Sequence, residues 1–589
     1  MDKAWVLKPA VDKEIVQRLR GELNINEALV TLLVQRGITT YEEARAFFRP
    51  SLDDLHDPFL LKDMDKAVER IDQAVARKEK ILVYGDYDVD GTTAVALIYT
   101  FLREFYNNLG FYIPDRYSEG YGISYKAIDF AAENGYSLII ALDCGIKAVE
   151  KVKYAATKNI DFIIADHHRP GDELPPAVAV LDPKRPDCNY PFEELSGCGV
   201  GFKIIQAYSL RKGWPFVNLY KYLDLVVVSI AADIVNITGE NRILAYYGLK
   251  LLNSQPRPGF EALLEISGIK RLEKPENPEK VFSKELTISD LVFTLGPRIN
   301  AAGRIDTGNN SVELLISTSI EEARQRAEQI NNCNTERRNL DSSITQEALE
   351  ILENDPESKE AFTNLIYKPD WHKGVIGIVA SRLTEIYYRP TIVLCKSNGL
   401  ITGSARSIKD FDIYDAIDAC SDLLEHFGGH TYAAGLSLKP ENLKRFRARF
   451  EEYAREKFKG IHPVPEIEID YYLTLSDITP KFFDILKQFA PFGPGNMSPV
   501  FATEKVMDTG YSRLVGKNHI KLSVVHPHIS GYPVSGIAFQ LGHYFPEIQK
   551  GTPFSICYHI EENEWNGKVS LQLNVKDIKL DPESSIEYF

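Results

Sequence analysis

The sequence predicts an α/β protein in which a parallel-sheet domain follows a short lead-in, a long helix connects it to a second α/β part, and the chain ends in a β-rich part. In residues 56–250, short apolar runs such as ILVY and DFIIA alternate with amphipathic segments such as TTAVALIYTFLREFY, the rhythm of βαβ units. Residues 320–353 contain neither Gly nor Pro and are rich in helix formers. Further along, IKLSVV and VSLQLNV alternate apolar and polar residues, which is typical of strands with one buried face.

These patterns divide the chain into five parts. We expect a helical lead-in with a stop at Pro50, a first catalytic domain, a connecting helix, a second α/β domain and a β-barrel, over 1–55, 56–319, 320–354, 355–460 and 461–589. The connecting helix would span roughly 50 Å, at about 1.5 Å per residue. In the last part, Asn566 and Gly567 predict a hairpin turn between two strand-like runs.

Composition indicates a globular protein. The 589 residues are 44% hydrophobic and 11% aromatic, which is enough for several ordinary cores. No apolar run approaches the roughly 20 residues of a membrane span, and the first residues lack the apolar core of a secretory signal, so we expect no membrane association and a cytoplasmic location. The seven cysteines form no C-x-x-C pair, which predicts free thiols. The net charge of −15 argues against broad polyanion binding, although carboxylates that bind cations contribute to that total.

Four acidic or histidine clusters each follow an apolar run, and we interpret all four runs as buried strands. In an open parallel sheet, ligands bind outside the carboxyl ends of the strands, so these clusters are expected to converge in one crevice. The residues concerned are Asp86, Asp88 and Asp90, then Asp143, then Asp166, His167 and His168, and finally Asp233.

This collection predicts a site for two divalent metal ions. DYDVDG resembles the start of a calcium loop, but Leu97 stands where that loop needs a bidentate Glu. A lone Asp here would simply cap the helix expected from Thr92. Three carboxylates within five residues repel one another unless a cation intervenes. Oxygen ligands with one or two imidazoles suit manganese or magnesium better than structural zinc, and two such ions about 4 Å apart serve in-line displacement at phosphorus.

Three later motifs carry groups that suit phosphate binding. GPRINAAGRIDTG holds Arg298, Asn300 and Arg304 among small residues, with a tight turn bearing surface arginines as the alternative. We interpret two further short-residue segments as loops that offer hydroxyl, guanidinium, imidazole and backbone donors: Ser404 and Arg406 in one, and Gly428, Gly429 and His430 in the other. The basic segment LKRFRARFEEYAREKFKG is either a solvated helix face or the rim of a nucleic-acid groove. SGCGVGFK lacks the spacing of a phosphate-binding P-loop and is interpreted as a helix start.

The order DYDVDG, DCG, DHH, AAD resembles the DHH phosphoesterase superfamily. GPRINAAGR, DWHKGVIGIVASRL, GSARS and FGGHTYAAG, followed by a β-rich end, narrow the resemblance to RecJ-type single-strand-specific exonucleases over roughly residues 55–580. Asn236 and Met497 stand where that family usually has Pro, beside the expected ligands.

The resemblance implies a 5′ to 3′ exonuclease that degrades single-stranded DNA to mononucleotides in repair and recombination. It also implies two Mn²⁺ or Mg²⁺ ions, an OB-fold-like barrel that guides the strand, and a DNA helicase and a single-strand-binding protein as partners. Carried over by motif, the metal ligands would be Asp86, Asp88, Asp90, Asp143, His167 and Asp233, and the catalytic residues His168 and Asp166. The substrate-binding residues would be Arg116, Arg298, Asn300, Arg304, Ser404, Arg406, Gly428, Gly429 and His430.

Two other functions stay open on sequence grounds. One is a DHH phosphodiesterase for RNA or short oligonucleotides, against which the length and the β-rich tail argue. The other is a non-enzymatic replication scaffold, which resembles the nuclease but has lost its ligands, whereas here every ligand position is filled.

Overall fold

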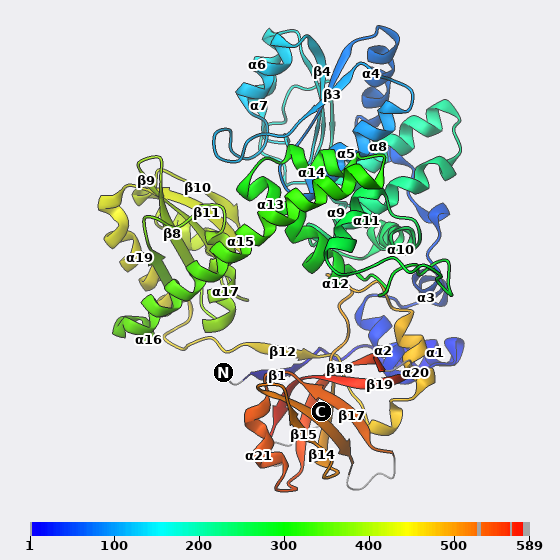
Figure 1. Ribbon diagram of the computed structural model, residues 1–589, viewed down its shortest axis with the longest axis vertical. Helices are drawn as coiled ribbons and strands as arrows, with labels where there is room; N and C mark the ends of the chain where they lie inside the picture. The colour runs from blue at the N-terminus through cyan, green and yellow to red at the C-terminus, as the bar shows by residue number, and fades with distance from the viewer. Residues whose placement is uncertain (1–2, 527–531, 566–567, 581–589) are drawn as a thin grey trace. The chain divides into compact units, whose positions relative to one another are not determined.

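The computed structural model describes residues 3–526, 532–565 and 568–580, which fall into two compact units (Figure 1). The larger unit contains residues 56–235 and 247–464. The smaller unit takes its described residues from 1–55, 236–246 and 465–589.

A five-stranded parallel sheet in the order β3-β2-β4-β5-β6 forms the first part of the larger unit. Its strands are β2 (Lys80–Gly85), β3 (Leu109–Tyr112), β4 (Tyr136–Leu142), β5 (Asp161–Ala165) and β6 (Ala179–Leu181). The accompanying helices are α4 (Met64–Ala76), α5 (Val89–Arg103), α6 (Tyr125–Glu133), α7 (Val149–Thr157) and α8 (Gly197–Lys212). The three apolar runs that end at the first three clusters form β2, β4 and β5, so the predicted parallel sheet is confirmed for them.

The fourth run was wrongly predicted as a strand. LDLVVVSIAA forms helix α9 (Leu223–Ala232). Every residue of this helix is buried except Ala232 at its end. A helix buried on every side shows no apolar periodicity, so its β-branched residues imitate a buried strand. The ten-residue length of the run was the contrary signal, since strands usually have four to eight residues.

Helices fill the rest of the larger unit's first part. They are α11 (Pro258–Ile266), α12 (Ile288–Asp290), α13 (Gly296–Ile305), α14 (Asn309–Leu315) and the second half of α10 (Gly239–Ser254), whose residues up to 246 belong to the smaller unit. The motif GPRINAAGR is therefore helical, and the tight-turn alternative is wrong.

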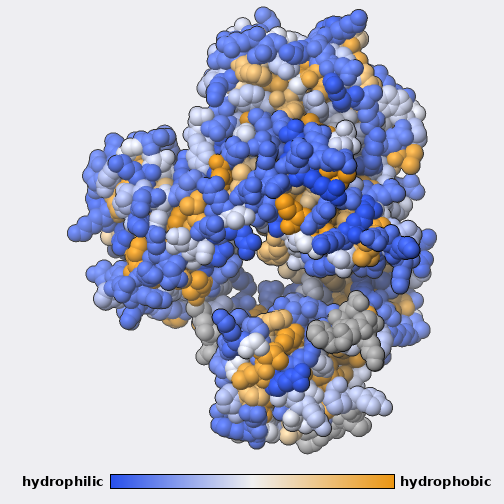
Figure 2. Space-filling view, in the orientation of Figure 1, coloured by the Kyte–Doolittle hydropathy of each residue, from blue (hydrophilic) through white to orange (hydrophobic). Residues whose placement is uncertain are grey.

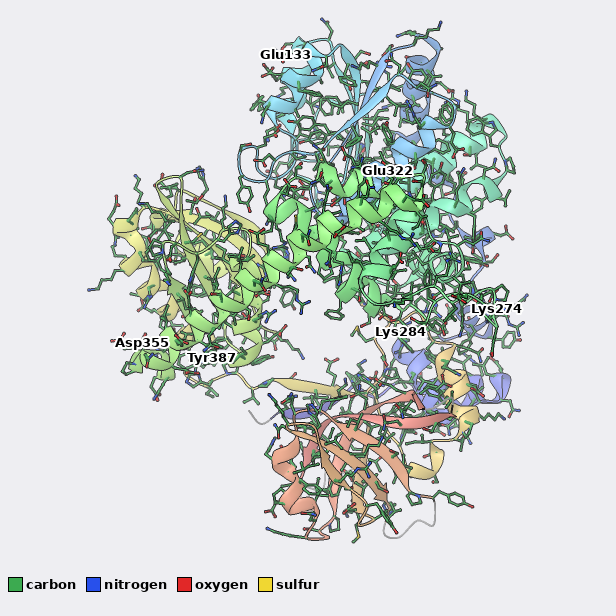
Figure 3. All side chains as sticks on the ribbon, viewed as in Figure 1. Glu133, Lys274, Lys284, Glu322, Asp355 and Tyr387 are labelled. Atoms are coloured by element: carbon green, nitrogen blue, oxygen red, sulfur yellow. The ribbon has the colours of Figure 1, made fainter. Side chains whose placement is uncertain are left out.

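Helix α15 (Ile320–Asn354) runs unbroken for 35 residues, which confirms the predicted long helix. Figure 3 labels Glu322 near its start and Asp355 just past its end. The C-terminal half packs Ile344, Ala348 and Leu352 against helix α17 (Ile376–Tyr387).

A second sheet follows, in the order β10-β11-β9-β8-β7. Its strands are β7 (Asn364–Tyr367), β8 (Thr391–Ser397), β9 (Leu400–Arg406), β10 (His426–His430) and β11 (Ala433–Leu438). Other helices of this part are α16 (Pro356–Glu360), α18 (Ile413–Asp418) and α19 (Leu443–Lys457), with α18 and α19 packed on the face opposite α17. The segments GSAR and FGGH lie on β9 and β10, so the prediction that they are loops is wrong. Their small residues leave one face of the sheet bare instead of breaking its strands.

The smaller unit contains the β-rich part. β14 (Phe501–Asp508), β18 (Phe554–Trp565), β19 (Lys568–Lys579), β17 (Val534–Ala538) and β16 (His519–Val525) pair in a ring that closes between β14 and β16. A closed five-stranded barrel is the architecture of an OB-fold. The predicted turn at Asn566 and Gly567 lies outside the described residues, although β18 and β19 on either side of it pair antiparallel.

Residues near the N-terminus share the barrel's core. Helices α1 (Lys13–Leu23), α2 (Glu27–Gln35) and α3 (Tyr41–Phe48) confirm a largely helical start, and α2 and α3 bury apolar residues beside those of the barrel. Further elements of this unit are β1 (Ala4–Leu7), β12 (Glu466–Ile469), β13 (Tyr471–Tyr472), β15 (Arg513–Val515), α20 (Pro480–Lys487) and α21 (Phe545–Ile548).

Hydrophilic residues cover most of the face seen in Figure 2, with apolar residues in small separate patches. Within the described ranges, the structure contains no helix with the length and apolar character that crossing a membrane requires.

Candidate metal centre

The four predicted clusters meet at the carboxyl edge of the parallel sheet. Asp86 follows β2, Asp143 follows β4, and Asp166 begins the segment after β5. Asp233 reaches the same place from the C-terminal end of helix α9. One centre thus draws on segments about 150 residues apart, as the sequence predicted, but one of the four segments is a helix.

The turn after β2 is built for close packing. Asp88 caps helix α5, and its Oδ1 accepts a hydrogen bond from the Gly91 amide at 3.0 Å. The helix therefore begins at Val89, three residues before the predicted start, and a strand precedes the turn, so the calcium-loop alternative is excluded. A Cβ on Gly91 would lie 2.4 Å from the carbonyl oxygen of Asp86, so only glycine lets helix and turn approach this closely.

The N-terminus of helix α8 holds Asp90. The Gly197 amide donates to Asp90 Oδ2 and the Cys198 amide donates to Oδ1, both at 2.7 Å. The Ser229 hydroxyl donates to Oδ1 at 2.6 Å. Helix N-termini stabilise anions through these free amides and the helix dipole. SGCGVGFK is thus the helix start that was predicted, and it also orients a candidate ligand.

Asp143 occupies a constrained position. Its backbone is left-handed, with φ 58°, which is uncommon for a residue other than glycine. A Cβ on Gly197 would lie 2.6 Å from the Asp143 Cβ, so the glycine at the start of α8 leaves room for this side chain. Backbone strain of this kind clusters at functional sites.

His167 lies at the middle of the centre. Its Nε2 is 3.2 Å from Asp143 Oδ1, 3.6 Å from Asp90 Oδ2 and 3.6 Å from Asp233 Oδ2. Two sets of side chains each bring their ligand atoms within 4.8 Å of one another: Asp143, His167 and His168, and Asp90, His167 and Asp233. Asp86 and Asp88 lie beside these two sets but belong to neither.

The electrostatics of this cluster fit a bound cation. Burial, and then the charge of Asp90, raise the pKa of Asp143 well above its usual range, and the same two causes raise the pKa of Asp233 to about 8. Burial and the charge of Asp88 likewise raise the pKa of Asp86. Asp143 Oδ2 and both ring nitrogens of His167 are buried and make no hydrogen bond with any described residue. Buried polar groups are normally satisfied, so these orphaned ligand atoms and mutually repelling carboxylates fit divalent metal binding.

A second histidine is held by a carboxylate. Asp166 Oδ1 contacts His168 Nδ1 at 2.7 Å, and Asp166 Oδ2 accepts from the Ile146 amide at 2.9 Å. Burial would lower the pKa of His168, but the hydrogen bond and charge of Asp166 raise it to about 9. Burial would raise the pKa of Asp166, but His168 brings it down to about 2. The Tyr121 hydroxyl lies 3.1 Å from His168 Nε2. His168 is therefore an imidazolium at neutral pH in the metal-free protein.

Arginines from three elements and one loop gather next to this centre. Burial lowers the pKa of Arg304 to about 10, with further lowering by the charges of Arg116, Arg337 and Arg406. The Arg304 guanidinium donates to the Gly374 carbonyl at 3.0 Å, and Arg116 lies 4.9 Å over the Tyr87 ring. In the described part of the chain, none of these four arginines forms an ion pair with a carboxylate. Unpaired, half-buried guanidiniums point to an anionic ligand.

The other predicted substrate residues divide into two places. Arg298 and Asn300 lie half-buried on α13, where Arg298 donates to the Thr294 carbonyl at 2.7 Å. On the second sheet, Arg406 donates to the Ser404 hydroxyl at 3.1 Å, and Ser404 lies opposite Gly435, which in turn lies opposite Gly428. The last two predicted residues, Gly429 and His430, follow on β10.

Several residues at the site were not predicted from the sequence. Arg337 and Arg338 lie on α15, which was treated only as a connection between domains, and their charges lower the pKa of Arg298 after burial does. The adjacent pair of arginines in an otherwise mixed helix was the available signal. Tyr121 beside His168 had no distinguishing signal among 30 tyrosines.

Sequence profiles of three domain families match the chain. The N-terminal domain of the DHH family matches residues 80–230, the DHHA1 domain matches 360–456, and the RecJ OB domain matches 469–577.

Named relatives match over most of their length. The single-stranded-DNA-specific exonuclease RecJ of Bacillus subtilis is 37% identical, covering 96% of this chain and 70% of the relative. That of Escherichia coli is 34% identical, covering 88% of this chain and 90% of the relative. The crystal structure of Thermus thermophilus RecJ in complex with Mn²⁺ matches with a TM-score of 0.81 at 25% identity, covering 98% of this chain and 79% of that one. The chain therefore belongs to the RecJ family of the DHH superfamily.

Proposed function

We propose that this chain is a metal-dependent exonuclease that hydrolyses single-stranded DNA from its 5′ end, releases 5′-mononucleotides, and acts in DNA repair and recombination. The observation that carries the proposal is the convergence of Asp90, Asp143, His167 and Asp233 on one point beside a group of arginines without carboxylate partners. A carboxylate-rich metal centre next to a cationic surface suits phosphodiester hydrolysis.

Two Mn²⁺ or Mg²⁺ ions are the proposed cofactors. The residues that would hold them are Asp86, Asp88, Asp90, Asp143, His167 and Asp233. When bound, the ions supply an activated water and neutralise the charge that develops on the phosphate. The chain's own contribution is to fix these side chains, as the α8 N-terminus does for Asp90.

His168 is the proposed proton donor. Water adds to the scissile phosphorus, the bond from phosphorus to the 3′ oxygen of the terminal nucleotide breaks, and the imidazolium protonates that oxygen. Asp166, predicted as catalytic, acts here as a positioning residue because its oxygens are occupied by His168 and by backbone amides.

The second sheet is proposed to hold the 5′ end of the strand. Ser404, Arg406, Arg304 and Arg116 supply donors to the terminal phosphate, with the bare backbone at Gly428, next to Gly429, allowing close approach. Arg298, Asn300 and His430 would contact the strand on either side. A fixed 5′ end explains cleavage one nucleotide at a time.

The Arg406→Ala variant is expected to bind a 5′-phosphorylated single strand about ten- to a hundredfold more weakly, since a charge-assisted hydrogen bond contributes about 1.5–3 kcal/mol. The slope of log affinity against log salt should fall by about 0.7 for the lost phosphate contact. Fluorescence anisotropy at several salt concentrations in EDTA measures both. Arg447→Ala on the exposed face of α19 is the matched control. An equal loss of affinity in this variant would indicate that α19 forms the rim of the groove that binds the strand.

The reaction itself is tested with 5′- and 3′-labelled single strands, blunt duplex and matching RNA, in manganese, magnesium or EDTA. Early release of mononucleotide from the 5′ label of single-stranded DNA, blocked by EDTA, is the expected result. Preference for RNA or dinucleotides would favour the alternative phosphodiesterase, and binding without turnover would favour a scaffold.

The proposed partners are single-stranded DNA, a DNA helicase that exposes it and a single-strand-binding protein that coats it, and the proposed location is the cytoplasm. All seven cysteines are free thiols, which suits a reducing compartment.

A further inference from the structure

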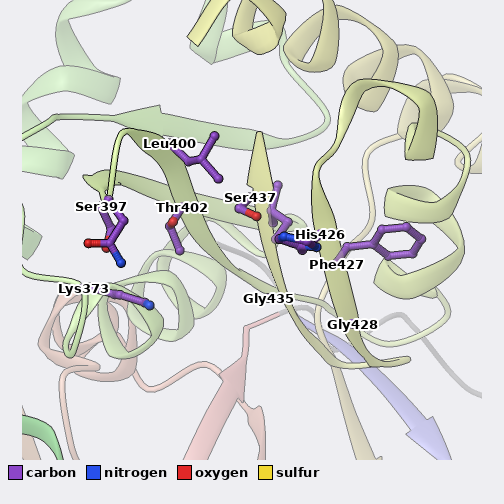
Figure 4. A pocket seen from close by; sticks show the side chains of 11 residues that line it. Lys373, Ser397, Leu400, Thr402, His426, Phe427, Gly428, Gly435 and Ser437 are labelled. Atoms are coloured by element: carbon purple, nitrogen blue, oxygen red, sulfur yellow. The ribbon is translucent and has the colours of Figure 1, made fainter. Parts of the chain in front are cut away.

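A pocket of about 360 Å³ lies on the second sheet, next to the residues proposed to hold the 5′ phosphate (Figure 4). Lys373, Thr402, His426 and Ser437 surround it in Figure 4, whereas the Phe427 ring points away. No Asp or Glu lines the pocket, although the chain as a whole carries a net charge of −15. A cation, an imidazole and hydroxyls without a carboxylate are suited to binding an anion.

Strand register places this pocket relative to Ser404. Directly opposed residues of antiparallel strands point to the same face, so Ser404, Gly435 and Gly428 form one row across the sheet. Thr402, Ser437 and His426 form the next row on that face. The rows are two residues apart, about 7 Å at the usual rise of a strand. The second row lies on the side of Ser404 away from Arg406 and hence away from the arginine group.

The polar groups of the second row have no other role in the fold. Within the described residues, the side chains of Lys373, Thr402, His426 and Ser437 make no hydrogen bond or ion pair. Lys373 lines the same pocket as this row. Its charge opposes the burial that raises the pKa of Cys395, the residue paired with Thr402, to about 11. Donors that face one pocket and make no hydrogen bond within the protein indicate a ligand-binding site and not a structural role.

Beside Ser404, the first row itself is bare, because its other two members are glycines. A Cβ added to Gly428 would meet no heavy atom within 4 Å, and one added to Gly435 would meet only the Gly403 carbonyl oxygen at 3.9 Å. A ligand held at Ser404 can therefore extend along the backbone into the pocket without displacing any side chain.

We propose that this pocket holds the outer phosphoryl groups of a 5′-polyphosphorylated strand end, such as a 5′-triphosphate. The proposal rests on the proposed function, in which Ser404 and Arg406 hold the phosphate nearest the sugar. Water still adds to the same scissile phosphorus and the same bond to the 3′ oxygen breaks. The product is then a nucleoside triphosphate instead of a monophosphate, with no further reactant.

The test compares one DNA sequence bearing a 5′-hydroxyl, a 5′-monophosphate or a 5′-triphosphate. The unsubstituted protein with Mn²⁺ is expected to release nucleoside triphosphate from the triphosphate strand, with a KM no higher than that for the monophosphate strand. Lys373→Met should raise the KM for the triphosphate strand about tenfold, since loss of one charged contact costs about 1.5 kcal/mol. His426→Ala should raise it about fivefold, since loss of one hydrogen bond costs about 1 kcal/mol. Neither should change the KM for the monophosphate strand.

Lys396→Met is the matched control. Lys396 is an exposed lysine on β8 paired with Ile401, whose side chain is buried on the opposite face of the sheet, so the same charge is lost away from the pocket. A protein that cleaves the monophosphate strand but leaves the triphosphate strand intact would overturn the pocket assignment, as would variants that affect both strands equally.

A binding measurement separates this proposal from the proposed function. Inorganic tripolyphosphate, titrated calorimetrically in EDTA, is expected to bind the unsubstituted protein and the Lys396→Met variant and to lose affinity about tenfold with Lys373→Met. Binding of tripolyphosphate without cleavage of any strand would overturn the exonuclease and keep the pocket. Cleavage of the monophosphate strand without tripolyphosphate binding would overturn the pocket and keep the exonuclease.

Discussion

Replacing Asp143 with asparagine is expected to lower the rate of nucleotide release at least about a thousandfold, a loss of about 4 kcal/mol in transition-state stabilisation. Asp143 Oδ1 lies 3.2 Å from His167 Nε2 and 3.9 Å from His168 Nδ1, so it joins the metal cluster to the proposed proton donor. Its Oδ2 is buried without a hydrogen bond. Asparagine keeps the shape of the side chain but removes its charge and one oxygen, both of which a divalent ion requires.

Single-turnover release of mononucleotide from a 5′-labelled strand measures the rate. Calorimetric titration with Mn²⁺ gives a second readout, in which the variant should show weaker or incomplete metal binding. Asp129→Asn is the matched control, since Asp129 pairs with Tyr154 and Lys158 at the surface. A variant at position 143 that cleaves at nearly the normal rate would remove Asp143 from the ligand set.

Most of the centre could be predicted because its geometry follows from strand order. Residues that come just after β2, β4 and β5 must meet at one edge of a parallel sheet, whatever lies between them in the sequence. The apolar runs before Asp86, Asp143 and Asp166 are short and bounded by turn residues, so their identification as strands was secure.

The errors share a physical cause, which is that local sequence does not report what surrounds a segment. Helix α9 is buried on all sides and therefore shows the uniform apolar pattern of a buried strand. The strands at Ser404 and at Gly428 contain small residues that suggested loops. The strand at Ser404 is nevertheless paired with a neighbour on both sides, and the strand at Gly428 with a neighbour on one side. Strand pairing is a long-range property, and only the structure revealed it.

Long-range packing also explains the residues that the sequence did not identify. The hydrogen bond from the Gly197 amide, at the α8 N-terminus, to Asp90 joins residues 107 positions apart. The charge of Arg337, on a helix interpreted as a connector, reaches Arg304 on another helix. The row of Thr402, Ser437 and His426 exists only through strand register. No local motif carries any of these relations.

Without metal, the centre is expected to make the protein less stable as the pH rises. The pKa of Asp233 is raised to about 8, and those of Asp86, Asp88 and Asp143 are also raised, so the folded protein binds more protons than the unfolded chain from about pH 4 upward. The free energy of unfolding then falls with increasing pH until these groups ionise in the folded state. The lowered pKa of His167 makes the free energy of unfolding rise with pH, but this is one group against the four carboxylates.

Asp233→Asn isolates this effect. In EDTA, its melting temperature should match that of the unsubstituted protein near pH 4 and exceed it at pH 8, because asparagine removes a carboxylate that is costly to ionise there. The order should reverse with Mn²⁺: at 100 times the dissociation constant, the ion stabilises the unsubstituted protein by about 2.7 kcal/mol, or several degrees. The variant should gain less. A variant less stable than the unsubstituted protein at pH 8 in EDTA would mean that Asp233 is held by protein contacts alone, and that the clustering of carboxylates has another cause than metal binding.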